Sequence, residues 1–168
     1  MAFSLIPRGV YPSFSALDPK ALRAKGIKLV LADLDNTLVP YKVPTPNEGV
    51  VAWKEALEAE GIQLFILSNS RKPGRAQRFA EALGVPFQGH SGKPKKKGYV
   101  RALERMGAKP SEAVMVGDQI FTDILGANNA GVVPLLVEPI RLAGNPGRYV
   151  RYAVETPFRT LGKRRPFV

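Results

Sequence analysis

Short apolar runs alternate along the chain with segments in which apolar residues recur every three or four positions. The short runs, several of them rich in β-branched residues, are typical of buried strands, and the longer segments are typical of amphipathic helices. The predicted strands cover residues 27–32, 62–67, 85–87, 113–116 and 132–137. The predicted helices cover residues 18–26, 46–61, 73–83, 94–106 and 122–129. Because strand and helix alternate strictly, the pattern predicts an α/β fold: a doubly wound, mostly parallel five-stranded sheet with right-handed crossovers and helices on both faces.

The regular pattern covers the middle of the chain and is lost at both ends. Residues 1–16 carry scattered aromatic and proline residues and are expected to be irregular. Residues 138–168 form a basic extension, in which Pro157 is expected to interrupt any helix. We therefore expect a single core at residues 1–137, including an N-terminal extension and helix at 1–26. The C-terminal extension is expected to be no separate domain.

The chain of 168 residues is strongly basic, with a formal net charge of +11 at pH 7. The residues after Pro139 contribute +6 of this, from seven cations and one acid, Glu155. Those cations are Arg141, Arg148, Arg151, Arg159, Lys163, Arg164 and Arg165. Such an excess predicts attraction to nucleic acid, to anionic lipid or to a phosphorylated substrate. Interleaved aromatic residues, among them Tyr149, Tyr152 and Phe158, either meet a membrane interface or complete the edge of the core.

Other features of the sequence exclude some kinds of site and some kinds of membrane segment. The chain contains no cysteine, which excludes disulfides, thiolate metal sites and cysteine nucleophiles, so any metal must be held by oxygen. No apolar run reaches the length of a membrane span. The first residues lack the charged region and long apolar core of a signal peptide. We expect a cytoplasmic protein that is able to touch the inner face of the membrane as a peripheral partner.

Two carboxylates follow the first predicted strand, in the stretch D-L-D-N-T-L that begins at Asp33. Burying unpaired charge is costly, so Asp33 and Asp35 need water, a basic partner or a cation. Mg²⁺ suits them because it prefers hard oxygen ligands and keeps room for a substrate phosphate. The alternative is a polar turn that only redirects the chain.

Polar residues also follow three later segments. Ser68 and Asn69 follow the second strand, and Asp118 comes directly after a glycine at the end of the fourth. Asp123 lies five residues further on, at the start of a helix. A run of lysines follows the short third strand, and its first member, Lys93, precedes a proline; Lys95 is an alternative for the same role. Because parallel strands end at one edge of the sheet, these side chains are expected to gather there.

In these motifs the sequence resembles the haloacid dehalogenase (HAD) superfamily of phosphotransferases, over about residues 17–137. Asp33, Asp35, Thr37 and Leu38 match its first motif, D-x-D-x-T-L. The stretch D-L-D-N-T-L-V-P is most similar to a cap-less family of subclass IIIA, which includes YqeG-type proteins and mitochondrial phosphatidylglycerophosphate phosphatases. The resemblance implies a phosphatase that uses Mg²⁺ and forms an aspartyl-phosphate.

The resemblance also assigns roles to individual residues. It implies that Asp33 is the nucleophile and that Asp35 is the general acid and base, with its backbone carbonyl on the metal. Asp118 would bind Mg²⁺ and Lys93 would offset charge during transfer. The resemblance also implies that the phosphate is bound by Thr37, Ser68 and Asn69, and that the metal is bound by Asp33, Asp35 and Asp118. Asp123 would support the metal site.

Many HAD enzymes carry a cap domain over the active site, inserted either after the first motif or between the second and third motifs. In this sequence only residues 39–45 and 71–92 are available at these two places, so neither has room for a cap domain. An open site suits a large substrate, or a homo-oligomer in which a partner subunit completes it. With the basic extension, this favours a lipid phosphate, and the resemblance suggests phosphatidylglycerophosphate. Alternatives are a nucleotide, a nucleic-acid end, a sugar phosphate or a phosphoprotein as substrate. A nucleic-acid- or ribosome-binding protein is a third reading, which the intact acidic motifs oppose.

Overall fold

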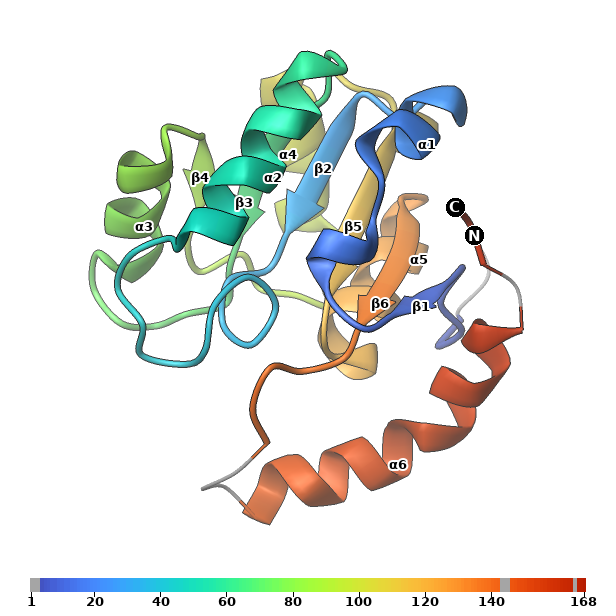
Figure 1. Cartoon of the computed structure of the whole chain (residues 1–168). Helices are drawn as coiled ribbons and strands as arrows, with labels where there is room; N and C mark the ends of the chain where they lie inside the picture. The colour runs from blue at the N-terminus through green and yellow to red at the C-terminus, as the bar shows by residue number, and fades with distance from the viewer. Residues whose placement is uncertain (1–3, 143–145, 165) are drawn as a thin grey trace.

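The computed structural model describes residues 4–142, 146–164 and 166–168, and it confirms the predicted α/β architecture (Figure 1). One sheet of six parallel strands has the order β1-β6-β5-β2-β3-β4. The strands are β1 (Val10–Tyr11), β2 (Leu29–Ala32), β3 (Gln63–Leu67), β4 (Phe87–Gln88), β5 (Ala113–Gly117) and β6 (Val133–Val137). All five predicted strands are present. The sixth, β1, lies in the segment that was expected to be irregular, because two residues are too few to produce a periodic pattern.

Six α-helices accompany the sheet in the part of the chain that is described. They are α1 (Pro19–Ala24), α2 (Glu48–Ala59), α3 (Arg75–Leu83), α4 (Lys97–Met106), α5 (Leu125–Ala130) and α6 (Pro146–Lys163). Short 3₁₀ turns occur at Phe14–Ala16 and Pro110–Glu112, and a wider π-helical turn at Ile120–Ile124 leads into α5. The fourth helix starts at Lys97, three residues later than predicted, because residues 92–95 form a tight turn closed by a bond from the Lys95 N–H to the Gly92 carbonyl.

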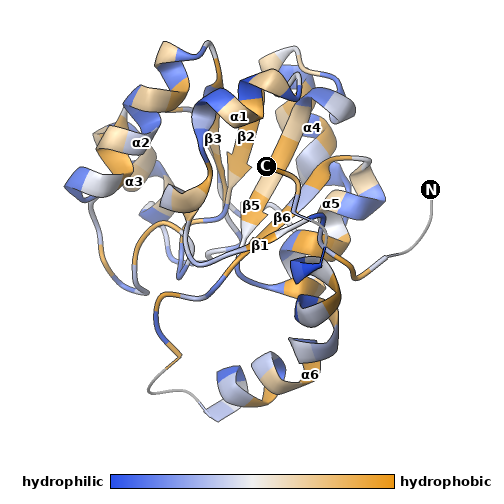
Figure 2. Ribbon diagram, turned by 45° about the vertical axis from the view of Figure 1, so that its right-hand side comes forward, coloured by the Kyte–Doolittle hydropathy of each residue, from blue (hydrophilic) through white to orange (hydrophobic). Residues whose placement is uncertain are grey.

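The sheet has an apolar layer on each face. Alternate residues of β2 point to opposite sides, so Val30 and Ala32 contact one layer while Leu29 and Leu31 contact the other. Residues of α1, α2 and α3 pack in the first layer, and residues of α4 and α5 pack in the second. Figure 2 shows the strands as largely hydrophobic and the helices as mixed, as this arrangement requires.

The order of the strands determines where a ligand can bind. The chain runs from β2 outward through β3 and β4, and then returns to the other side of β2 for β5 and β6. The connections therefore change direction between β2 and β5. In open α/β sheets, ligands bind outside the carboxyl ends of the strands at such a point. Residues 33–47 link β2 to α2, and residues 68–74 link β3 to α3, so each connection after these strand ends is a loop without a further domain.

The C-terminal extension forms a long helix, which the sequence analysis did not expect. Helix α6 continues through Pro157, so the predicted interruption is wrong. Glu155 and Arg159, on either side of the proline, are 1% and 3% exposed and are held by the core. This tertiary packing outweighs the cost of about 3 kcal/mol that proline imposes on a helix interior. The helix runs past the edge at which the strands end, and it bends along its length (Figure 1).

The opposite face of α6 points outward and keeps apolar side chains exposed. Val150, Val154 and Leu161 are 65%, 54% and 44% exposed. Arg165, one of the cations of the extension, lies outside the described residues. None of the helices in the described ranges is long and apolar enough to cross a membrane.

Candidate active site

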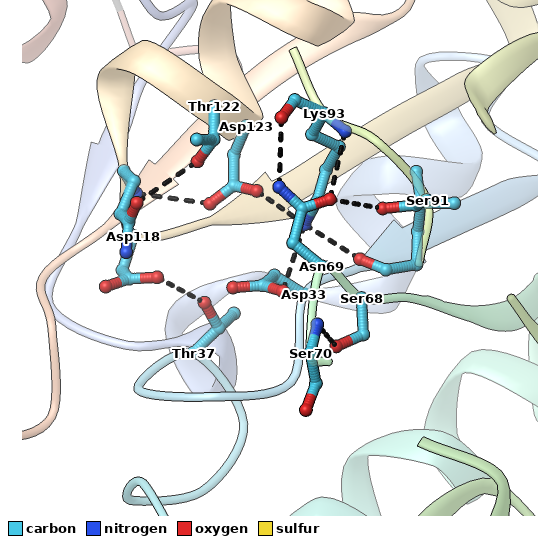
Figure 3. A network of polar contacts seen from close by, with 12 residues as sticks. Asp33, Thr37, Ser68, Asn69, Ser70, Ser91, Lys93, Asp118, Thr122 and Asp123 are labelled. Carbon is cyan, nitrogen blue, oxygen red and sulfur yellow. Dashed lines mark hydrogen bonds and ion pairs between the residues drawn. The ribbon is translucent and has the colours of Figure 1, made fainter. Parts of the chain in front are cut away.

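The polar residues that follow the strands converge at the switch point between β2 and β5 (Figure 3). Asp33 follows β2, Ser68 follows β3, and Asp118 follows β5. Lys93 reaches the same place from the loop after β4. A cavity at this edge is lined by Asp33, Asp35, Asn36, Tyr41, Ser68, Asn69, Ser70, Lys93, Gln119, Thr122 and Arg148. The predicted residues therefore do come together, as the parallel sheet requires.

Lys93 is the cation at the centre of the site. Its Nζ donates to Asp33 Oδ1 at 2.9 Å, to Asp123 Oδ1 at 2.7 Å and to the Leu67 carbonyl at 2.8 Å. Burial alone would lower the pKa of Lys93, but the two carboxylates outweigh it and raise the pKa above its usual value. Lys93 therefore stays protonated. Lys95, the alternative from the sequence, is exposed.

Three carboxylates lie together beside this lysine, which forms ion pairs with two of them, Asp33 and Asp123. Oxygen atoms of Asp33, Asp118 and Asp123 lie within 4.8 Å of one another. Burial raises the pKa of Asp33 from 3.8 to about 6, an effect that Lys93 opposes and that Asp123 adds to. Burial, with the charges of Asp33 and Asp123, also raises the pKa of Asp118 well above its usual value. The folded protein thus binds protons at these groups more tightly than the unfolded chain, so stability is lost as pH rises from about 4 to about 6 through the Asp33 transition.

This excess of negative charge fits a divalent cation. When all three carboxylates are ionised, they leave about two charges that the single ammonium does not compensate, and a hard cation with oxygen ligands would neutralise them. The carboxylate of Asp35 is not part of this group of three. The sequence-based assignment of Asp35 to the metal rests on its backbone carbonyl, so this placement of the carboxylate does not conflict with it.

Two further residues hold Asp118 and Asp123 in place. The Thr37 hydroxyl donates to Asp118 Oδ1 at 3.1 Å, so this side chain supports the acid; its assignment to the phosphate stays a prediction. The Gln119 N–H donates to Asp123 Oδ2 at 3.2 Å. Gly117 makes room for this arrangement, because a Cβ at that position would overlap the carboxylate of Asp123.

The side chain of Asn69 shapes the lysine loop. Its Nδ2 donates to the Lys93 carbonyl at 2.9 Å, and its Oδ1 accepts from the Lys93 N–H and from the Ser91 hydroxyl at 2.9 and 2.7 Å. The amide is therefore committed to positioning Lys93. The Ser68 oxygen accepts from the Ser70 N–H at 3.0 Å, which leaves its own proton free to be donated to a ligand.

Asp35 has a partner that the sequence analysis missed. Arg75, at the start of α3, donates from Nε to Asp35 Oδ1 at 2.9 Å, and a second guanidinium nitrogen donates to the same oxygen. Another bond, to the Val43 carbonyl at 2.7 Å, fixes the guanidinium. A signal existed: Arg75 lies on the same helix face as buried Phe79 and Leu83, and a cation at a helix N-terminus is unfavourable without a partner.

Helix α6 supplies the other missed residues. Arg159 donates to the Asp118 carbonyl at 2.7 Å and to Glu155 at 3.1 Å, and Glu155 accepts from the Ile120 N–H at 2.9 Å. Both contacts fix the loop that carries Asp118. Burial raises the pKa of Glu155, although Arg159 opposes this shift. The extension is therefore part of the structure that supports the acids, and no local pattern in the sequence pointed to it.

For the activity that the resemblance implies, Mg²⁺-dependent phosphate-ester hydrolysis, we expect Arg159→Lys to lower kcat/KM about tenfold and to raise the Mg²⁺ concentration needed for half-maximal activity. Lysine keeps the charge but cannot hold both the Asp118 carbonyl and Glu155. The readout is a Mg²⁺ titration of the rate, with melting temperature measured alongside. Arg164→Lys, the same exchange at an exposed position, is the control. A lower melting temperature with an unchanged Mg²⁺ requirement would contradict this role.

Comparisons with known proteins agree with this geometry. A family model for haloacid dehalogenase-like hydrolases matches residues 21–131. The Bacillus subtilis protein named Probable phosphatase YqeG is 34% identical over 145 residues, which cover 86% of this chain and 83% of that protein. The chloroplastic phosphatidylglycerophosphate phosphatase 1 of Chlamydomonas reinhardtii is 30% identical over 149 residues. That match covers 84% of this chain but only 55% of the Chlamydomonas enzyme.

A solved structure supports the fold independently. A Legionella pneumophila hydrolase assigned to subfamily III A of the HAD superfamily superposes with a TM-score of 0.52 at 17% identity, covering 87% of this chain and 88% of the other. The family match spans most of the chain, and the Bacillus relative is similar over 83% of its own length. The chain therefore belongs to the haloacid dehalogenase-like hydrolases, and it is one of their phosphatases.

Proposed function

We propose that this phosphatase hydrolyses a phosphomonoester through an aspartyl-phosphate on Asp33, with Mg²⁺ as cofactor. The observation that carries the proposal is the position of Asp33. Its carboxylate lies at the switch point, beside one lysine and two further acids. A carboxylate nucleophile divides one difficult displacement into two easier steps.

In the first step, an Asp33 oxygen forms a bond to phosphorus as the bond to the leaving oxygen breaks. Asp35 donates a proton to that leaving oxygen. In the second step, Asp35 takes a proton from water, which attacks the aspartyl-phosphate and releases inorganic phosphate and free Asp33. Both bonds from Arg75 end on Asp35 Oδ1, so Arg75 holds the carboxylate in one orientation. Lys93 and the Ser68 hydroxyl offset charge on the transferring group.

The carboxylates of Asp33 and Asp118, with the backbone carbonyl of Asp35, are the groups that we expect to hold Mg²⁺. When bound, the ion would offset the charge of the phosphate and of the nucleophile. Asp123 is already engaged by Lys93 and by the Gln119 N–H, which suits a supporting place. Thr37 supports Asp118, and Asn69 supports Lys93.

For the substrate, we propose phosphatidylglycerophosphate. The Chlamydomonas relative is named for this activity. No domain covers the cavity in the loops after β2 and β3, so a large substrate can approach. The outward face of α6 exposes Val150, Val154 and Leu161, and the exposed cations Lys163 and Arg164 lie at its end. A face of this composition suits the surface of an anionic membrane, which we propose as a peripheral partner.

The test is phosphate release from phosphatidylglycerophosphate in mixed micelles, with Mg²⁺ or with EDTA. We expect turnover that depends on the metal and exceeds the rate on para-nitrophenyl phosphate by at least about tenfold in kcat/KM, because remote parts of a true substrate contribute binding energy to the reaction. The same protein should sediment with phosphatidylglycerol vesicles and not with neutral phosphatidylcholine vesicles.

Equal rates on the lipid and on small esters would contradict the lipid substrate and direct attention to nucleotides, sugar phosphates and nucleic-acid ends. Metal-independent turnover would contradict the role of Mg²⁺. Absence of sedimentation with anionic vesicles would contradict the membrane contact alone, because micellar substrate can be hydrolysed without it.

A further inference from the structure

A second cavity adjoins the one that holds Asp33. Asn36, Gln119 and Arg148 line both cavities, so they form the boundary between them. Beyond that boundary, the second cavity lies between the segment after β6 and the inner face of α6. Its remaining lining residues are Asp118, Pro139, Leu142, Arg151, Tyr152, Glu155 and Arg159. The second cavity has a volume of about 20 Å³, which is too small for a phosphate. A molecule with one end at Asp33 would instead pass the boundary on its solvent side, against half-buried Arg148 and exposed Arg151.

Two arginines that line the second cavity have no acidic partner. Arg148 and Arg151 lie three residues apart on α6, where like charges repel each other. Among the described residues, which include every acid of the chain, no carboxylate lies within 4.0 Å of either guanidinium. The neighbouring Arg159 is neutralised by Glu155 and Glu138. Two of the three arginines on this helix face are thus left for an anion from outside.

Existing contacts aim both guanidiniums toward the cavities. Arg151 donates to Gln119 Oε1 at 2.9 Å, which holds it against the loop after β5. The guanidinium carbon of Arg148 lies 5.0 Å from the centre of the Tyr41 ring, and Tyr41 itself lines the Asp33 cavity. Lys72 lies over the same ring at 4.6 Å. Stacking on an aromatic ring restrains a guanidinium while leaving its N–H groups available.

The boundary also contains an unused acceptor. Asn36 is 4% exposed, and its Oδ1 has no hydrogen-bond partner among the described residues. A buried acceptor of this kind is costly unless a ligand or water donates to it. A substrate with a hydroxyl group between its two phosphates would donate the missing hydrogen bond to Asn36 Oδ1.

We propose that Arg148 and Arg151 bind a second anionic group of the substrate, a phosphodiester, while its phosphomonoester lies at Asp33. The proposal rests on the proposed phosphatase function and names residues that select among its substrates. Guanidinium forks match the paired oxygens of a phosphodiester. In this proposal, the phosphomonoester is bound by Lys93, Ser68 and the metal site. The two arginines add contacts to the phosphodiester, which a simple phosphomonoester substrate lacks.

The test compares two soluble esters that differ by that group. Glycerol phosphate carries one phosphomonoester, whereas deacylated phosphatidylglycerophosphate carries one phosphomonoester and one phosphodiester. We expect the wild type to prefer the second by at least about tenfold in kcat/KM. Arg148→Gln and Arg151→Gln should each lower kcat/KM for the diphosphorylated ester about tenfold more than for glycerol phosphate. Arg101→Gln removes an exposed cation on α4 that lines neither cavity, and it should change neither rate.

A binding measurement separates this inference from the proposed function. In the Asp33→Asn background, calorimetry should detect binding of the diphosphorylated ester, and Arg148→Gln should weaken it about tenfold. If the wild type hydrolyses neither ester, the proposed function fails, and this binding comparison still decides the inference. Equal wild-type kcat/KM for the two esters, equal losses on both, or unchanged binding in Arg148→Gln would overturn it.

Discussion

Replacing Asp33 by asparagine should lower phosphate release by at least about 10³-fold while leaving the protein folded. The amide has nearly the shape of the carboxylate but cannot form the bond to phosphorus. The measurement is single-turnover release of phosphate under saturating Mg²⁺. Asp18→Asn makes the same exchange at the exposed N-cap of α1, where asparagine caps a helix as well as aspartate does, and it should leave the rate unchanged.

The fold should survive Asp33→Asn because the ionised carboxylate of Asp33 destabilises the folded protein. Its pKa is raised to about 6, so keeping it ionised at neutral pH lowers the free energy of unfolding, and a neutral amide removes that cost. Lys93 keeps its bonds to Asp123 and to the Leu67 carbonyl. The melting temperature at pH 7.5 without metal should therefore stay equal or rise. Retained turnover would exclude Asp33 as the nucleophile, and a large fall in melting temperature would mean that unfolding explains the lost activity.

The sheet and the position of its acids were predictable because both depend on local pattern. Alternation of strand and helix predicts a parallel sheet, and a parallel sheet brings residues that follow different strands to one edge. Asp33 and Asp118 are 85 residues apart in sequence, yet each follows a strand, and β2 and β5 pair directly. No knowledge of side-chain contacts was needed to place them together.

The supporting residues could not be placed in the same way, because they lie far in sequence from their partners and belong to no motif themselves. Arg159 looks like an ordinary surface cation in the sequence but is 3% exposed, and Arg75, which is 6% exposed, is marked only by its place on the buried face of α3. Helix α6 was missed for a related reason. Local propensity at Pro157 opposes a helix, while the bonds of Glu155 and Arg159 to the loop after β5 hold one. In the C-terminal extension, α6 therefore has an inner face that supports the loop carrying Asp118 and an outer face that is exposed to solvent.

Lys93→Met should cause the largest combined loss of activity and stability. Nζ of Lys93 is the one cation within ion-pair distance of Asp33 and Asp123 among the described residues. Methionine preserves the length and apolar stem but leaves buried carboxylates without their partner, which typically costs about 3–5 kcal/mol. For a domain of this size we expect the melting temperature at pH 7.5 to fall by about 10 °C. Turnover should fall by at least about 10³-fold, since the variant lacks the charge that we propose to offset the transferring phosphoryl group.

Lys95→Met is the matched control, because this exposed lysine lies two residues away on the same loop. It should change neither the melting temperature nor the rate. The pH dependence gives a second check: without Lys93, the carboxylates can avoid their unpaired charge only by taking up protons, which raises their pKa values further. The melting temperature of Lys93→Met should therefore recover as the pH is lowered from about 7.5 to about 5.5. Loss of activity in Lys95→Met with full activity in Lys93→Met would reverse the assignment of the two lysines.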